Sequence, residues 1–164
     1  MEIAVYRDEY KDDVISLILG IQNDKAGIGL SLQEQPDLLD IPGCYRRDGG
    51  EFWIALADGR LIGTIGLMPK GKDCAVLKKF FVKKEFRSQG VGLALYGRLL
   101  EFAGEAGIRR IILDTPSVAH ASHRFYEAAG FHRIGREELP VPYSYPDRDS
   151  ILYRLDLQKR RRTT

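Results

Sequence analysis

The segment from Arg87 to Gly92 carries the most specific chemical signal in this sequence. It reads Arg-Ser-Gln-Gly-Val-Gly, follows an apolar run at residues 74–82 and leads directly into a helical pattern at residues 90–106. A glycine has no Cβ, so the backbone there can come close to an anion. The first turn of a helix adds unpaired N–H groups and the positive end of the helix dipole. The spacing therefore predicts a binding site for a phosphate group.

Two common phosphate-binding loops do not fit this segment. A Walker A loop ends in Gly-Lys-Ser/Thr, whereas Gly92 is followed by Leu93. The dinucleotide fingerprint needs a third small residue at the position that Leu95 occupies. What remains is an Arg-x-x-Gly-x-Gly pattern between a strand and a helix. A glycine-rich connection without a ligand is the alternative interpretation of this pattern alone.

A second block of interest lies at residues 111–134. It reads as a buried strand, a short helix and the beginning of another strand, and the helix ends in Phe125-Tyr126-Glu127-Ala128-Ala129-Gly130-Phe131. Gly130 stands where a left-handed residue ends a helix, and Phe131 begins the next strand. The occurrence of both blocks, in this order, is more specific than either block alone.

The two blocks resemble the conserved blocks of the GCN5-related N-acetyltransferase (GNAT) superfamily. The resemblance is strong over residues 74–134 and is limited to the order of elements elsewhere. It implies an α/β fold, with a mixed sheet in the order βααβββαβαββ whose fourth and fifth strands splay apart. It also implies acetyl-CoA as the co-substrate, with its pantetheine arm lying between those two strands like an extra strand.

The same resemblance assigns residues to the cofactor. The backbone of Phe80, Phe81 and Val82, at the end of the fourth strand, would pair with the amides of the pantetheine arm. Their side chains also fit a core role, and the two roles are compatible because the first uses main-chain atoms. The turn would bind the pyrophosphate through Arg87, Ser88, Gln89, Gly90, Val91 and Gly92. A plain surface charge is the alternative role for Arg87.

The resemblance assigns Tyr126 as the general acid for the departing thiolate. A phenol with a pKa of about 10 can donate to a thiolate whose conjugate pKa is about 8.5 without first losing its own proton. Packing on the helix with the hydroxyl at the surface is the alternative. Asp114 stands where some relatives have an acidic proton acceptor, and it could equally cap the turn before Pro116. His120 and His123 are expected to be exposed helix residues.

The sequence departs from the family pattern in two places. Many relatives have an asparagine seven residues before the tyrosine, and this position is Ala119 here. The fourth strand has no carboxylate after Asp73, so the glutamate that relatives place in that strand has no counterpart. The general base therefore stays open. Three nearby residues could replace the asparagine contact, namely Thr115, Ser117 and Ser122.

Length and composition are those of one globular domain. The chain has 164 residues and a mass of 18.6 kDa, with 44% hydrophobic and 29% charged residues. We expect a single domain at residues 1–158 and a basic tail at residues 159–164. The tail holds four positive side chains, and without them the net charge of +2 becomes −2. A nucleic-acid partner is therefore not expected.

The sequence gives no sign of a metal site, a leader peptide or a membrane segment. Cys44 and Cys74 are too few for a disulfide framework and lack metal-ligand spacing. The first ten residues include several charges, unlike a signal peptide. The longest apolar run, residues 14–21, is far shorter than the roughly 20 residues that span a bilayer. We therefore expect a cytoplasmic protein with no metal and no membrane partner.

Hydrophobic periodicity and turn signals predict the remaining elements. Asp8 is expected to cap a helix at residues 9–21, and a capping box of Ser31 and Glu34 is expected to open a second helix that runs through Leu39. The other predicted helices lie at residues 90–106 and 119–129. Strands are predicted at residues 3–5, 51–57, 61–67, 74–82, 108–113, 131–134 and 151–157, with Asp58-Gly59 as a hairpin turn.

The resemblance implies direct transfer of an acetyl group from acetyl-CoA to a primary amine of a small molecule or peptide. A non-catalytic domain that binds or senses acyl-CoA is the alternative, because Ala119 and the unassigned base weaken the match. The acceptor is expected on the face lined by the first two helices and the loop at residues 135–150. There Tyr143 and Tyr145 lie among carboxylates, a combination that could recognise a cation. Residues 27–31 could close over the acceptor, and a homodimer is one expected assembly.

Overall fold

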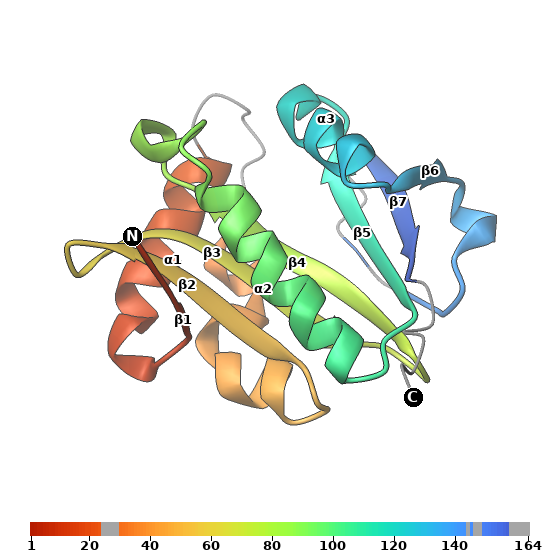
Figure 1. Cartoon of the computed structure of the whole chain (residues 1–164), viewed down its shortest axis with the longest axis horizontal. Helices are drawn as coiled ribbons and strands as arrows, with labels where there is room; N and C mark the ends of the chain where they lie inside the picture. Colours follow the sequence, from red (N-terminus) through yellow and green to blue (C-terminus); the bar gives the residue numbers. More distant parts are fainter. Residues whose placement is uncertain (24–29, 144, 146–148, 158–164) are drawn as a thin grey trace, which may run out of the picture.

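The computed structural model describes residues 1–23, 30–143, 145 and 149–157 (Figure 1). Most of the predicted closing loop at residues 27–31, and all of the predicted basic tail at residues 159–164, lie outside these ranges. Within them the chain forms one mixed sheet of seven strands with helices on both faces. The expected α/β fold with a mixed sheet is confirmed.

The strands follow the order β1-β2-β3-β4-β5-β7-β6 across the sheet. Neighbouring strands are antiparallel, except for the parallel pair β4 and β5 at the middle of the sheet. The strands are β1 (Glu2–Val5), β2 (Glu51–Ala57), β3 (Arg60–Pro69), β4 (Cys74–Val82), β5 (Arg110–Pro116), β6 (His132–Ile134) and β7 (Ser150–Asp156).

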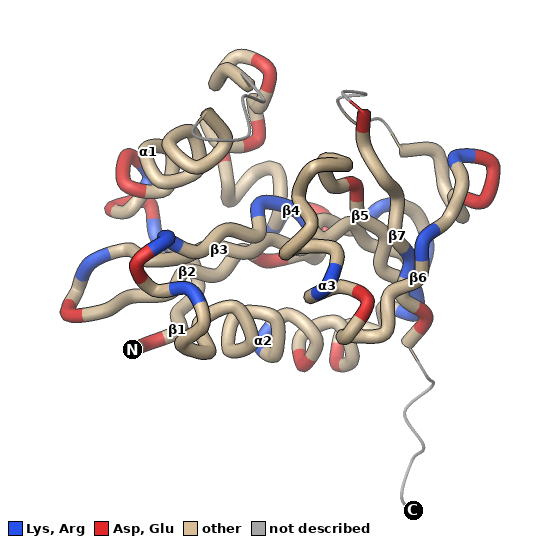
Figure 2. Tube along the Cα trace, turned by 90° about the horizontal axis from the view of Figure 1, so that it is seen from above, with Lys and Arg blue, Asp and Glu red and all other residues tan. Residues whose placement is uncertain are grey.

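Helices cover the sheet as two layers, which Figure 2 shows with the sheet seen edge-on. One face carries α1 (Lys11–Gln22) with η2 (Leu32–Glu34), η3 (Pro36–Leu39) and η4 (Pro42–Arg46). The other face carries α2 (Val91–Glu105) and α3 (His120–Ala128). Short turns lie between these elements, namely η1 (Asp8–Tyr10), η5 (Lys84–Phe86) and η6 (Arg136–Glu138). No helix in the described part of the chain combines the length and apolar character needed to cross a membrane.

The predicted second helix at residues 31–39 is wrong as a continuous element. The capping box of Ser31 and Glu34 forms as predicted, but it opens only the single 3-10 turn η2. Pro36 then starts a separate turn, η3. A proline disfavours helical geometry in the residue before it, and Gln35 accordingly has φ −131° and ψ 62°. The proline therefore divides the segment in two.

Two other predicted element boundaries, the starts of α1 and β5, differ from the structure for local reasons. Asp8 does not cap α1, because the turn η1 begins at Asp8 and no side chain caps either N-terminus. The strand predicted from residue 108 begins at Arg110, because Ile108 N–H still bonds the Ala103 carbonyl at the end of α2. The Asp58-Gly59 hairpin turn is confirmed, with φ of 50° and 76° at its two residues.

Strand β4 contains a bulge at Lys79. The register with β3 runs from Lys78 opposite Gly66 to Phe81 opposite Thr64, so β4 holds an extra residue. Lys79 has φ +54°, a left-handed value that is uncommon for a residue with a side chain. Its carbonyl accepts a hydrogen bond of 2.7 Å from the buried Thr64 hydroxyl, which holds the bulge in place.

The hydroxyl of Tyr96 in α2 is buried and has no hydrogen-bond partner among the described residues. Burial raises the pKa of Tyr96 to about 12. A buried polar atom without a partner costs about 1–3 kcal/mol, so Tyr96→Phe is expected to raise the free energy of unfolding by about 1 kcal/mol. Urea denaturation measures this change. Tyr153→Phe is the control, because the Tyr153 hydroxyl donates to Glu127 at 3.2 Å and its loss should not stabilise the protein. Destabilisation by Tyr96→Phe would contradict the expectation.

Candidate active site

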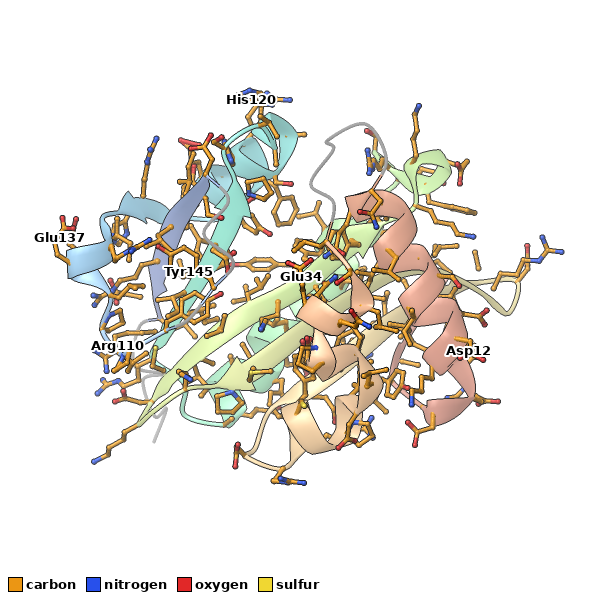
Figure 3. All side chains as sticks on the ribbon, turned by 180° about the vertical axis from the view of Figure 1, so that it is seen from behind. Asp12, Glu34, Arg110, His120, Glu137 and Tyr145 are labelled. Atoms are coloured by element: carbon orange, nitrogen blue, oxygen red, sulfur yellow. The ribbon has the colours of Figure 1, made fainter. Side chains whose placement is uncertain are left out.

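Strands β4 and β5 separate after a short paired stretch. They pair only from Cys74 to Val76 in β4, opposite Arg110 to Ile112 in β5. Figure 1 shows the two strands diverging from this end, and Figure 3 marks the closed end with Arg110 and the open end with His120. From residue 77 to residue 82, β4 is paired with β3 alone, while residues 113–116 of β5 pair with β7. The predicted splaying of these two strands is confirmed.

The predicted pantetheine-binding residues lie on the separated half of β4. Phe80 packs edge to face on Phe125 of α3, with ring centroids 5.2 Å apart. Phe81 packs in the opposite cluster beneath α1, and Val82 packs in the cluster beneath α2. The side chains therefore have the core role that was predicted, and the main-chain role stays a prediction.

The turn before α2 presents a row of free N–H groups. Ser88 has φ +64° and Gly90 has φ +82°, and Gly90 is the N-cap of α2 without a side-chain cap. In the described part of the chain, the backbone N–H groups of residues 88–93 have no acceptor, and the first helical bond of α2 is donated by Ala94 to Gly90. Successive amides in such a turn form a concave anion site, which the helix dipole strengthens.

Packing within the protein does not explain the two glycines of this turn. A Cβ built at Gly90 would have no atom within 4 Å, and one at Gly92 would meet only the rings of Phe80 and Phe125 at ordinary contact distance. The left-handed φ favours glycine at Gly90. At Gly92 a Cβ would make only ordinary contacts, so packing does not require glycine there. Glycine at both positions is compatible with a ligand that approaches the backbone closely.

Two further residues of the turn have partners within it. Arg87 is exposed, and its Nε donates to the Val82 carbonyl at 3.3 Å. Gln89 is also exposed, and its Nε2 donates to the Glu85 carbonyl at 3.0 Å. Among the described residues the other N–H groups of the Arg87 guanidinium have no partner, so they could meet an anion at the turn.

Tyr126 lies beneath the open end of the strand pair, with 7% of its surface exposed. Its ring packs against Phe131 and Tyr153, with centroids 5.5 and 6.0 Å away, and belongs to the same aromatic cluster as Phe80. Within the described ranges its hydroxyl makes no hydrogen bond. Burial, and then the charge of Asp114, raise the pKa of Tyr126 well above that of an ordinary phenol. The residue as a whole is buried, while its role as the general acid and the alternative of a hydroxyl at the surface both stay predictions.

Asp114 lies near the end of β5 and accepts a hydrogen bond from the Tyr143 hydroxyl. Burial, and then the charge of Asp114, raise the pKa of Tyr143 well above its ordinary value. The predicted alternative, in which Asp114 caps the turn before Pro116, is wrong. There is no such turn, because β5 continues through Pro116, and after the strand the Ser117 hydroxyl donates to Asp149 at 2.6 Å.

Near Ala119 the structure differs from the prediction in the burial of one residue, His123. Ala119 is the N-cap of α3 and provides no side-chain cap. His120 is exposed as predicted, but His123 is buried, and its Nε2 lies 2.9 Å from the Pro116 carbonyl. Helical periodicity explains this, because His123 shares the inner face of α3 with Tyr126.

One polar cluster at the site was not predicted. Lys79 Nζ donates to Gln35 Oε1 at 2.6 Å and lies 3.8 Å from Asp37 Oδ1. Gln35 also exchanges two hydrogen bonds of 2.8 Å with Gln22 of α1. The one signal in the sequence is the Lys78-Lys79 pair within an otherwise apolar strand. Only the tertiary fold brings Lys79 next to η2, η3 and α1.

Comparison with known proteins agrees with this arrangement. A sequence model of the acetyltransferase (GNAT) family matches residues 18–131. The chain belongs to this family. An acetyltransferase of Streptococcus agalactiae 2603 is 39% identical to this GNAT chain, and its crystal structure superposes with a TM-score of 0.91, covering 95% of this chain and 98% of that one.

Two further relatives add information about ligands. The N-acetylaspartate synthetase of Danio rerio is 34% identical over 104 residues, which cover 62% of this chain and 37% of that protein. An acetyltransferase of Bacillus anthracis str. Ames, solved in complex with acetyl coenzyme A, is 25% identical with a TM-score of 0.54, covering 66% of this chain and 62% of that one. This GNAT chain spans between 34% and 58% of the length of the curated relatives it matches.

Proposed function

We propose that this GNAT protein transfers the acetyl group of acetyl-CoA to a primary amine. The observation that carries this proposal is the alignment of three features along one gap: the free amides of residues 88–93, the unpaired edge of β4 and the free hydroxyl of Tyr126. A diphosphate, an extended amide chain and a thioester would meet these features in that order. The relatives named N-acetyltransferases or acetyltransferases support the same reaction.

The residues present fit the cofactor chemically. The free amides of the turn and the Arg87 guanidinium can donate to a pyrophosphate, and such charge-assisted bonds contribute about 1.5–3 kcal/mol each. The backbone groups of residues 77–82 that point away from β3 can pair with the amides of an extended pantetheine arm, as in strand addition. When bound, acetyl-CoA supplies the activated acetyl group.

The chemistry requires an uncharged amine, a fixed approach to the thioester and a proton for the thiolate. The gap between the strands would hold the two reactants together, an effect that can contribute about 7–11 kcal/mol. Tyr126 would stabilise the departing thiolate with a hydrogen bond from its hydroxyl, which its raised pKa keeps protonated, and the thiolate would take its final proton from solvent. Asp114, at the end of β5, would accept the proton of the incoming amine.

Calorimetry and a turnover assay together test this function. Acetyl-CoA and CoA should bind at sub-millimolar concentration, and release of free CoA should depend on an added amine. An amine panel should include amino acids, polyamines, aminoglycosides and a peptide with a free N-terminus. Lack of cofactor binding would contradict the proposal outright. Binding without amine-dependent turnover would instead favour a protein that senses acyl-CoA.

Asp114→Asn is expected to lower kcat/KM for the amine about ten- to a hundredfold near pH 7, since a positioned base contributes about 10²–10⁴-fold when it is required. The loss should shrink as the pH approaches the pKa of the amine, because more acceptor then arrives without its proton. The measurement is a pH profile of kcat/KM from pH 6 to 10. Asp149→Asn is the matched control, because Asp149 bonds Ser117 rather than Tyr143. An equal loss at every pH would remove Asp114 as the proton acceptor.

A further inference from the structure

The bulge in β4 turns two successive lysines towards the same face of the sheet. In a regular strand Lys78 and Lys79 would point to opposite faces. Here the charge of Lys78 acts on Cys44 of η4, and Lys79 contacts Gln35 and Asp37 of the segment around η3. Both side chains therefore lie on the face covered by α1 and the short helices. Figure 3 views this face, with Glu34 of η2 towards α1 and Tyr145 beside β5 and β7.

The ammonium of Lys79 is largely removed from water. Only 10% of the Lys79 side chain and 11% of the Asp37 side chain are exposed. Burial lowers the pKa of Lys79, although the charge of Asp37 opposes this shift. A buried charge is costly unless it has close partners. A lysine that served only to stabilise the fold would therefore cost free energy at this position, because its ammonium is removed from water.

The partners of Lys79 do not satisfy the ammonium fully. An ammonium has three N–H donors. Among the described residues, one donor reaches Gln35 Oε1 at 2.6 Å, and the nearest carboxylate oxygen, Asp37 Oδ1, is 3.8 Å away. The other oxygen of Asp37 already accepts from the Tyr45 hydroxyl at 2.7 Å. The ammonium thus has donor capacity left for one more acceptor.

The surroundings also hold the Lys79 head in place. Gln35 is fixed by its reciprocal pair of 2.8 Å bonds with Gln22, and Tyr45 is fully buried. A charge that is already ordered loses little entropy when it binds a ligand. The cluster therefore has the properties of a prepared anion site rather than a solvated surface charge.

A carboxylate on the other strand, also beyond the paired residues of β4 and β5, acts on this cation through its charge. Asp114 in β5 raises the pKa of Lys79 through its charge, and the same carboxylate acts on Tyr126. One strand of the separated pair thus contributes a cation and the other an anion. Two opposite charges across a gap are complementary to a ligand that carries both charges.

The aromatic pair in the loop is less suited to bind a cation by itself. Tyr143 and Tyr145 stack on each other, with ring centroids 5.4 Å apart. The Arg136 guanidinium lies 5.4 Å from the centroid of the Tyr145 ring, so a cation already occupies one ring face. The predicted recognition of a simple cationic amine by these rings therefore has less support than recognition by the charged pair.

We propose that the acceptor is an amine that also carries a carboxylate, such as an amino acid, and that Lys79 binds this carboxylate while Asp114 faces the amino group. This inference rests on the proposed acetyl transfer and names the substrate class for it. A zwitterion would meet both charges, whereas a simple amine would leave the remaining donors of the Lys79 ammonium unused and should therefore bind less well.

The test compares amino acids with their carboxamides in the amine-dependent release of CoA. Alanine, leucine, aspartate and β-alanine are assayed. Each amino acid is compared with the derivative in which a carboxamide replaces the carboxylate. For the pairs that react, the acid is expected to have a kcat/KM about ten- to a hundredfold higher than the amide. The amide has the less basic amine, so a difference in amine protonation works against this result. Equal or better turnover of the amides would overturn the inference and leave the proposed acetyl transfer intact.

Lys79→Met is expected to abolish the preference for the acid by raising its KM, while turnover of the amide changes little. Lys78→Met is the matched control, because it removes a neighbouring lysine on the same face without touching Gln35 or Asp37. A merely structural role for Lys79 would lower the turnover of both members of a pair equally. If Lys79→Met does not fold, as judged by its thermal melting, the test uses the ratio of kcat/KM for the acid to that for the amide. This ratio is then compared between the wild type and Lys79→Arg. Turnover of neither acids nor amides, together with turnover of simple amines, would also overturn the inference.

Discussion

Tyr126→Phe is expected to lower kcat about 10²- to 10⁴-fold while the Kd for CoA changes by no more than about twofold. The substitution removes one hydroxyl that has no hydrogen-bond partner among the described residues and leaves the ring in its aromatic cluster. Packing should therefore be preserved, and the loss should fall on the step that needs the proton. Steady-state kinetics with the best acceptor and calorimetry with CoA measure the two quantities.

Two comparisons make this expectation specific to the Tyr126 hydroxyl. Tyr153→Phe removes a phenol hydroxyl from a ring in contact with Tyr126, and kcat should stay within about threefold of wild type because this hydroxyl bonds Glu127 instead. The raised pKa of Tyr126 also means that deprotonation of this phenol should cause no fall in wild-type activity below about pH 10. An unchanged kcat in Tyr126→Phe would remove this residue from the mechanism.

Ser88→Asp is expected to raise the Kd for CoA about ten- to a hundredfold, and Ser88→Asn should leave it nearly unchanged. Both side chains tolerate the left-handed φ of +64° at this position, so the pair differs mainly in charge. The new carboxylate would lie beside the free amides of residues 88–93 and repel the pyrophosphate. Titration calorimetry at low and high salt measures the difference, which should decrease as salt screens the repulsion.

The same variant separates a defect in binding from a defect in folding. A negative charge at the N-terminus of α2 is favourable by about 0.3–1 kcal/mol, so Ser88→Asp without ligand should melt at the same temperature as wild type or slightly higher. Acetyl-pantetheine lacks the pyrophosphate and should be used equally well by both proteins. Wild-type affinity for CoA in Ser88→Asp would show that the turn does not hold the diphosphate.

Several features of this protein could be predicted from local sequence because their causes are local. The hairpin at Asp58-Gly59 and the left-handed residue at Gly130 depend on backbone freedom at single residues. The order of strands and helices follows from hydrophobic periodicity, and the strand–turn–helix segment with Arg87 and Gly90 follows from residue types within a few positions of each other. Pro36 shows the limit of this approach, because its effect on the neighbouring residue outweighed a correct capping box.

Other features depend on contacts between distant segments. The Tyr143 hydroxyl meets Asp114 from a loop far along the chain, which excluded the turn-capping role that local spacing suggested for Asp114. His123 is predicted to be an exposed helix residue, but the inner face of α3 buries it beside Tyr126.

The sequence by itself determined the family, the proposed phosphate-binding turn and the proposed general acid, because each depends on residue types at short, fixed spacings. The tertiary structure alone decided the charged pair of Lys79 and Asp114. A single extra residue in β4 reverses the direction of one side chain, and the separation of two strands sets the distance to the other. Neither effect leaves a periodic pattern in the sequence, because both arise from the pairing of residues that are far apart along the chain.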